Sequence, residues 1–337
     1  MERVNNMASH QQYQSVCAVV VTYNRKALLL ECLDGIKNQT VSVEAIYLVD
    51  NASSDGTPEA LLEAGLIAEL PQQGLNDSAI YTYKPENLGG ITLYYIRMNT
   101  NTGGAGGFHE GLKRAYDNPH SWFWLMDDDV EPLPVALSTQ LSFSYAGKCI
   151  MPGKKFPDGT VFPDDSHFCL TTGRMTPVLG KEFSQAEAFS CKNYGTFEGM
   201  LISREVVERV GFPDTRFFYI GDDFVYGAMA SLYTNVLMLK EPIFLKKLKR
   251  ADPKTVMGKE SVRLKEMEIY YGTRNRFLIF EYLKKLGTFS FFVAYVSVLT
   301  GVLRSTIGIV FIDRSPKKLY LLYKGLLDGM LKRFTGK

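Results

Sequence analysis

The sequence predicts an α/β fold built on a mostly parallel β-sheet. Four segments rich in β-branched and aromatic residues occur in the first half of the chain, at 16–24, 45–51, 92–99 and 122–129. Each segment is continuously apolar, which is typical of strands buried on both faces of a parallel sheet. Helical patterns separate these segments, and alternating strands and helices predict parallel strands joined by right-handed crossovers.

Helices are expected at several places along this pattern. The segment 26–39 has apolar residues at helical spacing, and Thr57 and Pro58 are typical of an N-cap and a first helical position. A helix should also follow the glycine-rich segment after the third strand. Further along, one helix is expected to begin near Ser203 and another just after the acidic pair 222–223.

The composition excludes several classes of protein. The chain has 337 residues, of which 46% are hydrophobic, and a net charge of +2, so it is expected to fold rather than remain disordered. Lys and Arg number 38 against 36 Asp and Glu, so a nucleic-acid partner is not expected. The five cysteines have no CxxC spacing, which argues against a disulfide framework or a cysteine zinc site.

Three regions are expected along the chain. Residues 1–14 form a polar tail, residues 15–245 form the α/β domain, and residues 246–337 form a helical region associated with a membrane. Residues 150–195, which are rich in Gly, Pro and polar residues, are interpreted as an excursion from the core.

The helical region contains an apolar stretch with basic flanks. Residues 286–303 carry no charge, Arg304 interrupts, and the apolar pattern resumes up to Ile312. We favour a helix lying on an anionic cytoplasmic leaflet, with a buried helical hairpin and a true span as alternatives. Residues 1–15 lack an apolar core and predict no secretory signal, so the expected location is peripheral, at the cytoplasmic face of the membrane.

Polar residues follow the ends of the predicted strands, at Thr22–Asn24, Asp50–Asn51, Asn99–Asn101 and Asp127–Asp129. The carboxyl ends of parallel strands meet at one edge of a sheet, where α/β proteins bind their ligands. We therefore expect the binding site at this edge.

Four glycines open the helix after the third strand. They match neither the dinucleotide fingerprint, which would need Gly at His109, nor the P-loop pattern. We favour a loop that offers backbone N–H groups to a phosphate, and the alternative is close packing of the helix on the sheet.

Two acidic clusters carry the candidate chemistry. Asp127 and Asp129 alternate at the end of an aromatic strand and could share Mn²⁺ or Mg²⁺, the alternative being a solvated turn. Asp222 and Asp223 follow an aromatic stretch, which suits a carboxylate of raised pKa that acts as a general base. Capping of the following helix is an alternative for one of the two.

Five motifs together resemble inverting family 2 glycosyltransferases. They are VVVTYNR (19–25), LVDNASSDGT (48–57), NTGGAGGFHEG (101–111), WLMDDDV (124–130) and IGDDFVYG (220–227), and they occur in the family order. The resemblance covers about residues 16–245, and the glycine loop before an Asp triplet is most similar to bacterial galactofuranosyltransferases, with rhamnosyltransferases next.

The resemblance implies a GT-A fold that binds a nucleotide-sugar donor. Thr22 and Asp50 would lie by the nucleobase and ribose, and Asp128 near the donor sugar. The residues expected to bind the donor are Thr22, Tyr23, Asn24, Asp50, Asn101, Gly103, Gly104, Gly106, Gly107 and Asp128.

The resemblance also implies the catalytic roles. Asp127 and Asp129 would hold the metal on the donor diphosphate, Asp223 would be the base, and Asp222 would contact the acceptor. Arg274 and Asn275 match a Tyr-Tyr-x-x-Arg-Asn segment that the family has after the acidic pair.

Three departures from the family pattern concern the same site. Val225 stands where the family often has Glu, and Met229 stands where it often has Arg. The family's metal-binding His usually follows the base by some twenty residues, but no His follows His167.

The function implied is transfer of galactofuranose from its UDP donor to a glycan acceptor, which is expected to be lipid-linked, in cell-surface polysaccharide synthesis. The alternatives are rhamnosyl transfer from dTDP-rhamnose and a non-catalytic subunit that binds a nucleotide or a glycan.

Overall fold

The computed structural model describes residues 15–71, 79–162, 166–177, 188–249, 254–256, 259–261 and 264–334. The expected tail 1–14 lies outside them.

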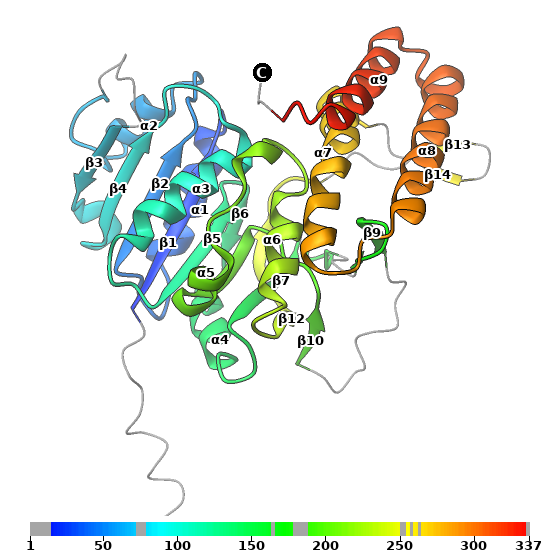
Figure 1. The fold of residues 1–337 in the computed structure, drawn as a ribbon. Coiled ribbons are helices and arrows are strands. Elements are labelled where there is room, and N and C mark those ends of the chain that lie inside the picture. Colours follow the sequence, from blue (N-terminus) through cyan, green and yellow to red (C-terminus); the bar gives the residue numbers. More distant parts are fainter. Residues whose placement is uncertain are drawn as a thin grey trace, which may run out of the picture.

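A mixed ten-stranded sheet forms the centre of the molecule (Figure 1). Strand β1 (Val16–Thr22) pairs in parallel with β2 (Ala45–Asp50) and β5 (Trp122–Asp127), and β2 pairs in parallel with β4 (Thr92–Arg97). The α/β prediction is therefore confirmed, with the predicted parallel strands at the centre of the sheet. The other strands extend it on both sides: β3 (Ala79–Tyr83), β11 (Glu198–Ser203), β7 (Cys149–Lys155), β12 (Val236–Lys246), β10 (Phe189–Lys192) and β6 (Val130–Pro132).

Each face of the sheet carries its own hydrophobic core. Every residue of β1 is buried, and its side chains alternate between the two faces. One core includes side chains of α1 (Lys26–Lys37), α2 (Thr57–Glu63) and α4 (Ala136–Ser142). The other includes side chains of α3 (Gly103–Tyr116), α5 (Arg204–Val210) and α6 (Asp222–Ala230).

Of three predicted helix starts, one is confirmed and two differ by a residue or two. Helix α5 begins as expected, since Ser203 is its N-cap and its Oγ accepts a hydrogen bond from the Val206 N–H. Helix α6 begins at Asp222 itself, so the acidic pair forms its first turn. The N-cap of α2 is Gly56 and not Thr57, because a left-handed backbone at Gly56 starts the helix one residue early.

The C-terminal helices form a separate layer beside the sheet (Figure 1). They are α7 (Glu266–Lys285), α8 (Phe291–Gly308), its π-helical continuation η3 (Ile309–Asp313) and α9 (Pro316–Met330). Helix α7 packs along α9, and a third core joins α7 and α8 to the excursion. The remaining short elements are η1 (Glu86–Leu88), η2 (Thr215–Phe217), β8 (Ser166–Cys169), β9 (Arg174–Pro177), β13 (Lys254–Val256) and β14 (Lys259–Ser261).

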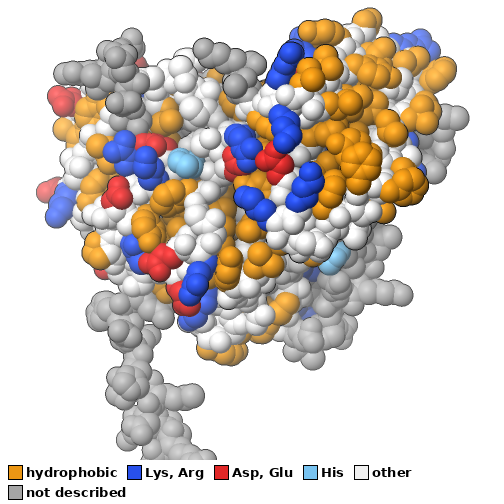
Figure 2. All heavy atoms as spheres, in the orientation of Figure 1, with side chains coloured by type: hydrophobic (Ala, Val, Ile, Leu, Met, Phe, Trp, Pro, Cys, Tyr) orange, Lys and Arg blue, Asp and Glu red, His pale blue; other side chains and the backbone are white. Residues whose placement is uncertain are grey.

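One helix is long and apolar enough to cross a membrane. It runs over Phe291–Asp313 with a mean hydropathy of 1.7, and only 17% of its most apolar window is buried. Figure 2 shows hydrophobic side chains gathered over this part of the molecule. The low burial does not fit the alternative of a buried hairpin, because few side chains of this helix are buried in the protein.

Candidate active site

Asp128 joins the ends of β1 and β5. Its carboxylate accepts hydrogen bonds from Thr22 Oγ1 at 2.7 Å, from the Tyr23 N–H at 3.3 Å and from Arg25 Nη1 at 3.0 Å. Burial raises its pKa, while Arg25 and Thr22 act in the opposite direction. Asp128 therefore anchors the edge of the site through contacts within the protein. Tyr23 is 44% exposed, so its ring can contact a ligand.

Asp50 is fully buried at the end of β2. Its carboxylate accepts hydrogen bonds from the Ser53 N–H and from Tyr95 Oη, each at 2.8 Å, and forms an ion pair with Arg97. Nearby, the Asn24 side chain accepts a hydrogen bond from the Ser54 N–H at 2.6 Å, which links the β1 end to the loop after β2. These bonds shape the part of the edge where a nucleoside is expected.

The glycines at the start of α3 are explained largely by packing. A Cβ on Gly103, whose φ is +73°, would lie 1.9 Å from the Phe218 carbonyl oxygen. A Cβ on Gly106 would lie 2.4 Å from Thr102, and one on Gly107 would lie 2.5 Å from Val21. Close packing, the alternative to a ligand-facing loop, therefore accounts for glycine at these three positions, and their contact with a ligand stays a prediction. Gly104 meets nothing within 4 Å and alone keeps the open position expected of a ligand contact.

Two asparagines hold this glycine segment in place. Asn51 is buried, donates from Nδ2 to the Gly103 carbonyl at 2.8 Å and accepts from the Thr102 N–H at 2.9 Å. Asn101 accepts from the Gly103 N–H at 2.8 Å. The N–H of Gly103 is thus already occupied and is not directed at a ligand.

Substitution of Gly103 should separate packing from ligand contact. Gly103→Ala should lower the thermal midpoint, because the left-handed backbone costs roughly 1–2 kcal/mol with a side chain and the methyl group collides with Phe218. The matched Gly104→Ala variant should keep or raise the midpoint and weaken donor binding. A lower midpoint for Gly104→Ala would contradict this assignment.

Asp127 and Asp129 lie close enough to interact strongly. The prediction attributed this proximity to alternating positions on one extended strand, and the structure shows another cause. The strand ends at Asp127, and residues 128–129 form a turn instead of continuing the extended alternation. Burial, followed by the charge of Asp129 and of Glu198, raises the pKa of Asp127 well above its usual range. Asp129 pairs with Arg25 at 3.3 Å. Proximity is therefore achieved by a turn.

This chemistry fits a divalent cation that is shared with a ligand. Asp127 accepts no side-chain hydrogen bond from the described part of the chain, so its carboxylate is available. Among the described residues, no group of three or more His, Cys, Asp or Glu side chains could hold a metal ion by itself. Two carboxylates would have to share the ion with the donor diphosphate and water.

Glu198, at the start of β11, interacts with both acidic clusters. It interacts electrostatically with both Asp127 and Asp223 and raises the pKa of each. Lys154 donates to it at 2.6 Å and Lys246 forms a second ion pair. The two lysines hold the pKa of Glu198 at about 2, although burial acts in the opposite direction. Glu198 is therefore ionised and places a negative charge beside the candidate base.

Asp222 and Asp223 begin α6, and both are half-buried. Burial raises the pKa of Asp222 to about 6. Burial and then the charge of Asp222 raise the pKa of Asp223 well above its usual range. The Asp223 carboxylate accepts one hydrogen bond, from the Phe224 N–H at 2.7 Å, and neither side chain caps the helix. A carboxyl group of raised pKa suits proton transfer near neutral pH.

Arg274 and Asn275 of α7 hold the loop before the acidic pair. Asn275 Nδ2 donates to the carbonyls of Phe217, Tyr219 and Ile220 at 2.8–3.0 Å. Arg274 is fully buried and donates to the Phe217 carbonyl at 2.9 Å.

The loop that these two residues hold is strained. Phe218 and Ile220 have φ values of +60° and +63°, which non-glycine residues rarely adopt. Arg274 and Asn275 thus position the base through the backbone.

Apolar residues and a lysine stand at the positions where the chain departs from the family pattern. Val225 is buried in the third core, and Met229 is half-buried on the same helix. Lys246 lies in the stretch that corresponds to the expected His and carries a positive charge, which lowers the pKa of Asp127. A lysine ammonium cannot ligate a cation, so this stretch offers no third ligand through Lys246.

The sequence model described as Glycosyl transferase family 2 matches residues 17–210, which is more than half of the chain. The chain belongs to glycosyltransferase family 2. This assignment makes it a glycosyltransferase.

Among curated proteins, galactofuranosyltransferase GlfT1 of Mycolicibacterium smegmatis is 30% identical over 215 residues, or 62% of each chain. A GlfT1 of Mycobacterium tuberculosis is 28% identical over 215 residues. The chain thus spans 62% of the length of these relatives.

Solved structures confirm the expected GT-A fold of this glycosyltransferase. S. aureus TarS 1-349 superimposes with a TM-score of 0.54 at 12% identity and covers 95% of this chain and 82% of that one. The mannosyltransferase PcManGT from Pyrobaculum calidifontis, solved with GDP-Man and Mn²⁺, gives 0.51 at 14% identity and covers 98% and 94%.

Several residues of the glycosyltransferase site were not predicted from the sequence. Arg25 and Asn51 lie inside two of the quoted motifs, close to Thr22 and Asp50 in the sequence. This proximity could have indicated that they belong to the site. Lys154 and Glu198 lie in stretches without a motif, 44 residues apart. Only sheet pairing brings β7 and β11 together, and so nothing local in the sequence indicates that contact.

Proposed function

We propose that this glycosyltransferase transfers galactofuranose from UDP-galactofuranose to a hydroxyl group of a lipid-linked glycan, with inversion at the anomeric carbon. The observation that carries the proposal is the pair of acidic clusters that both interact with Glu198, one suited to a metal and diphosphate and one to a general base. The similarity to the GlfT1 proteins supports the choice of donor.

The chain's own residues account for the proton transfer. Deprotonated Asp223 accepts the proton of the acceptor hydroxyl, and the acceptor oxygen attacks the anomeric carbon on the face opposite the diphosphate. The bond between that carbon and the diphosphate oxygen breaks, and UDP leaves with the electron pair. One base suffices for this single displacement, whereas glycoside hydrolysis uses two carboxylates. Arg274 and Asn275 keep the Asp223 carboxylate in place by holding the preceding backbone.

Asp127 and Asp129 would hold Mn²⁺ or Mg²⁺ at the diphosphate. When bound, the ion would neutralise charge on the leaving nucleoside diphosphate. Asp50 and the exposed ring of Tyr23 flank the space proposed for the nucleoside. Gly104 offers the open approach at the start of α3.

The donor can be tested by thermal shift with nucleotide sugars. UDP-galactofuranose at about 100 times its dissociation constant should stabilise the folded protein by about 2.7 kcal/mol. UDP-galactofuranose should raise the midpoint more than dTDP-rhamnose, and EDTA should reduce the difference. A larger shift with dTDP-rhamnose would replace the proposed donor by the rhamnosyl donor.

We also propose that the protein is peripheral at the cytoplasmic face of the membrane. The outer face of α8 exposes large apolar side chains, including Phe292 at 75% and Leu303 at 61%. Exposed Lys317 and Lys332 lie beyond the helix, where they pair with Glu266 and Glu281, and they can exchange these carboxylates for anionic lipids. An amphipathic helix of this kind lies in the interface and needs no complete span.

A further inference from the structure

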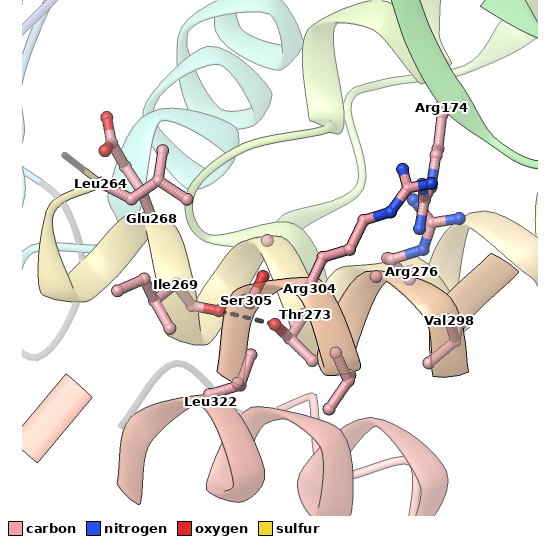
Figure 3. A pocket seen from close by; sticks show the side chains of 13 residues that line it. Arg174, Leu264, Glu268, Ile269, Thr273, Arg276, Val298, Arg304, Ser305 and Leu322 are labelled. Atoms are coloured by element: carbon pink, nitrogen blue, oxygen red, sulfur yellow. Dashed lines mark hydrogen bonds between the residues drawn. The ribbon is translucent and has the colours of Figure 1, made fainter. Parts of the chain in front are cut away.

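A cavity of about 360 Å³ lies among the C-terminal helices, away from both acidic clusters. Residues of α7, α8, α9 and the start of β9 line it (Figure 3). Its apolar wall includes Ile269, Val298 and Leu322, one from each helix. This is a mixed apolar and cationic site, unlike the acidic site at the sheet edge.

Three arginines from three different elements meet at one end of this cavity. Figure 3 shows the guanidinium groups of Arg174, Arg276 and Arg304 close together, with Glu268 at the opposite end. Glu268 already accepts a hydrogen bond from the Lys265 N–H at 2.7 Å, where it caps α7. The arginine end therefore has no carboxylate partner within the described parts of the chain.

The donors of these arginines are only partly used. Arg276 Nη2 donates to the Thr172 carbonyl at 2.6 Å and to Ser297 Oγ at 2.9 Å, but its buried Nε has no partner in the described structure. Arg174 donates to the Ser297 carbonyl. Arg304 is exposed at the mouth and forms no ion pair with any described residue. Unused donors and uncompensated charge both favour an anion.

The backbone of α8 is adapted to this arrangement. A Cβ on Gly301 would lie 2.4 Å from Arg174 Nη2, so glycine allows that guanidinium to lie against the helix. Burial and the charge of Arg174 lower the pKa of Arg276 to about 10, which reflects a cation near other cations.

The position of the cavity indicates where its anion comes from. Helix α8 lines the cavity through Val298 and Arg304, and exposes Leu299 and Leu303 on its apolar outer face. A helix is about 10 Å thick with its side chains, so a head group in the cavity would remain within reach of a bilayer below α8. The apolar wall could accompany the first part of a hydrocarbon chain.

We infer that the cavity of Arg174, Arg276 and Arg304 binds the terminal phosphate of a membrane lipid, that is, a phosphate monoester or a diphosphate and not the phosphodiester of a lipid such as phosphatidylserine. This inference rests on the proposed association with a membrane. Arginine recognises phosphate through paired N–H donors, which a phosphate monoester or diphosphate satisfies better than a carboxylate. The phosphate can belong to the lipid diphosphate of the acceptor or to a bilayer phospholipid.

Vesicle binding without donor tests this site. The probes are phosphatidylcholine vesicles that contain, at equal net charge, polyprenyl diphosphate, phosphatidic acid or phosphatidylserine. Arg304→Gln should lose about tenfold or more in affinity for vesicles with polyprenyl diphosphate or phosphatidic acid, the two probes with a terminal phosphate, because hydrogen bonds to charged groups contribute about that much. Arg304→Lys keeps the charge but not the paired N–H donors, so it should lose only part of this affinity.

Arg314→Gln is the matched control, since Arg314 is exposed at the end of the same helix and does not line the cavity. It should weaken binding slightly and equally for every anionic lipid. Thermal midpoints of all variants check folding. Equal losses for Arg304→Gln and Arg314→Gln, or no wild-type preference over phosphatidylserine, would overturn the inference.

The remaining arms identify the source of the phosphate. Tighter binding to polyprenyl diphosphate than to phosphatidic acid would identify the acceptor lipid as the source of the phosphate. Equal binding would identify a bilayer phospholipid as the source. Both results support a lipid phosphate site. Equally tight binding of inorganic pyrophosphate without vesicles would overturn it in favour of a soluble anion. A UDP thermal shift on the same samples reports donor binding separately, so failure of the cavity is distinguishable from failure of the proposed function.

Discussion

Replacement of Asp223 by Asn should lower the turnover number by about 10² to 10⁴ and leave UDP affinity nearly unchanged. The amide is nearly the same size but cannot accept the proton of the acceptor hydroxyl. Because Arg274 and Asn275 hold the preceding loop, the backbone should stay in place and the loss should be confined to chemistry. Single-turnover transfer and UDP titration measure the two effects separately.

Asp222→Asn is the control on the same helical turn. The charge of Asp222 raises the pKa of Asp223, so its removal lowers that pKa. The base is active when deprotonated, and the rise of activity with pH should therefore move to lower pH in Asp222→Asn. An Asp223→Asn enzyme with more than about a tenth of wild-type turnover would show that another group is the base.

Asp129→Ala should remove most of the metal-dependent affinity for UDP. The diphosphate would then share the cation with Asp127 alone, and we expect a loss of about tenfold or more. Arg25 would keep its bond to Asp128 at 3.0 Å, so the end of β5 should remain folded. The measurement is a UDP titration of wild type and variant in Mn²⁺, Mg²⁺ and EDTA.

Asp34→Ala is a suitable control, because Asp34 is an exposed carboxylate on α1 outside the site. It should bind UDP as the wild type does in all three conditions. With no His in the described stretch after the base, water should complete the metal shell, and Mg²⁺ should replace Mn²⁺ well.

Equal wild-type affinity for UDP in EDTA and in Mn²⁺ would show that the Asp triplet is not a metal site. A basic residue would then have to neutralise the diphosphate. In the structure Lys246 pairs with Glu198, Lys247 with Glu31 and Glu131, and Lys249 with Asp158, so each would have to exchange a carboxylate for the diphosphate.

The sequence by itself determined the four parallel strands at the centre of the ten-stranded sheet and the edge at which the site is expected. Continuous apolar runs such as 16–22 are typical of strands buried on both faces, and parallel pairing brings Thr22, Asp50 and Asp127 to one edge. Both predictions need only local sequence patterns and the rule that parallel strands end at the same edge of a sheet. Neither requires knowledge of a contact between residues far apart in the chain.

Tertiary structure alone decided the role of each residue at that edge. Gly103 is required by the Phe218 carbonyl, and Glu198 is kept ionised by Lys154 and Lys246. The arginine cavity likewise combines side chains from β9, α7 and α8. In each case the partners are far apart in the chain, and the free energy of a buried charge or a close contact depends on those partners and not on neighbouring residues.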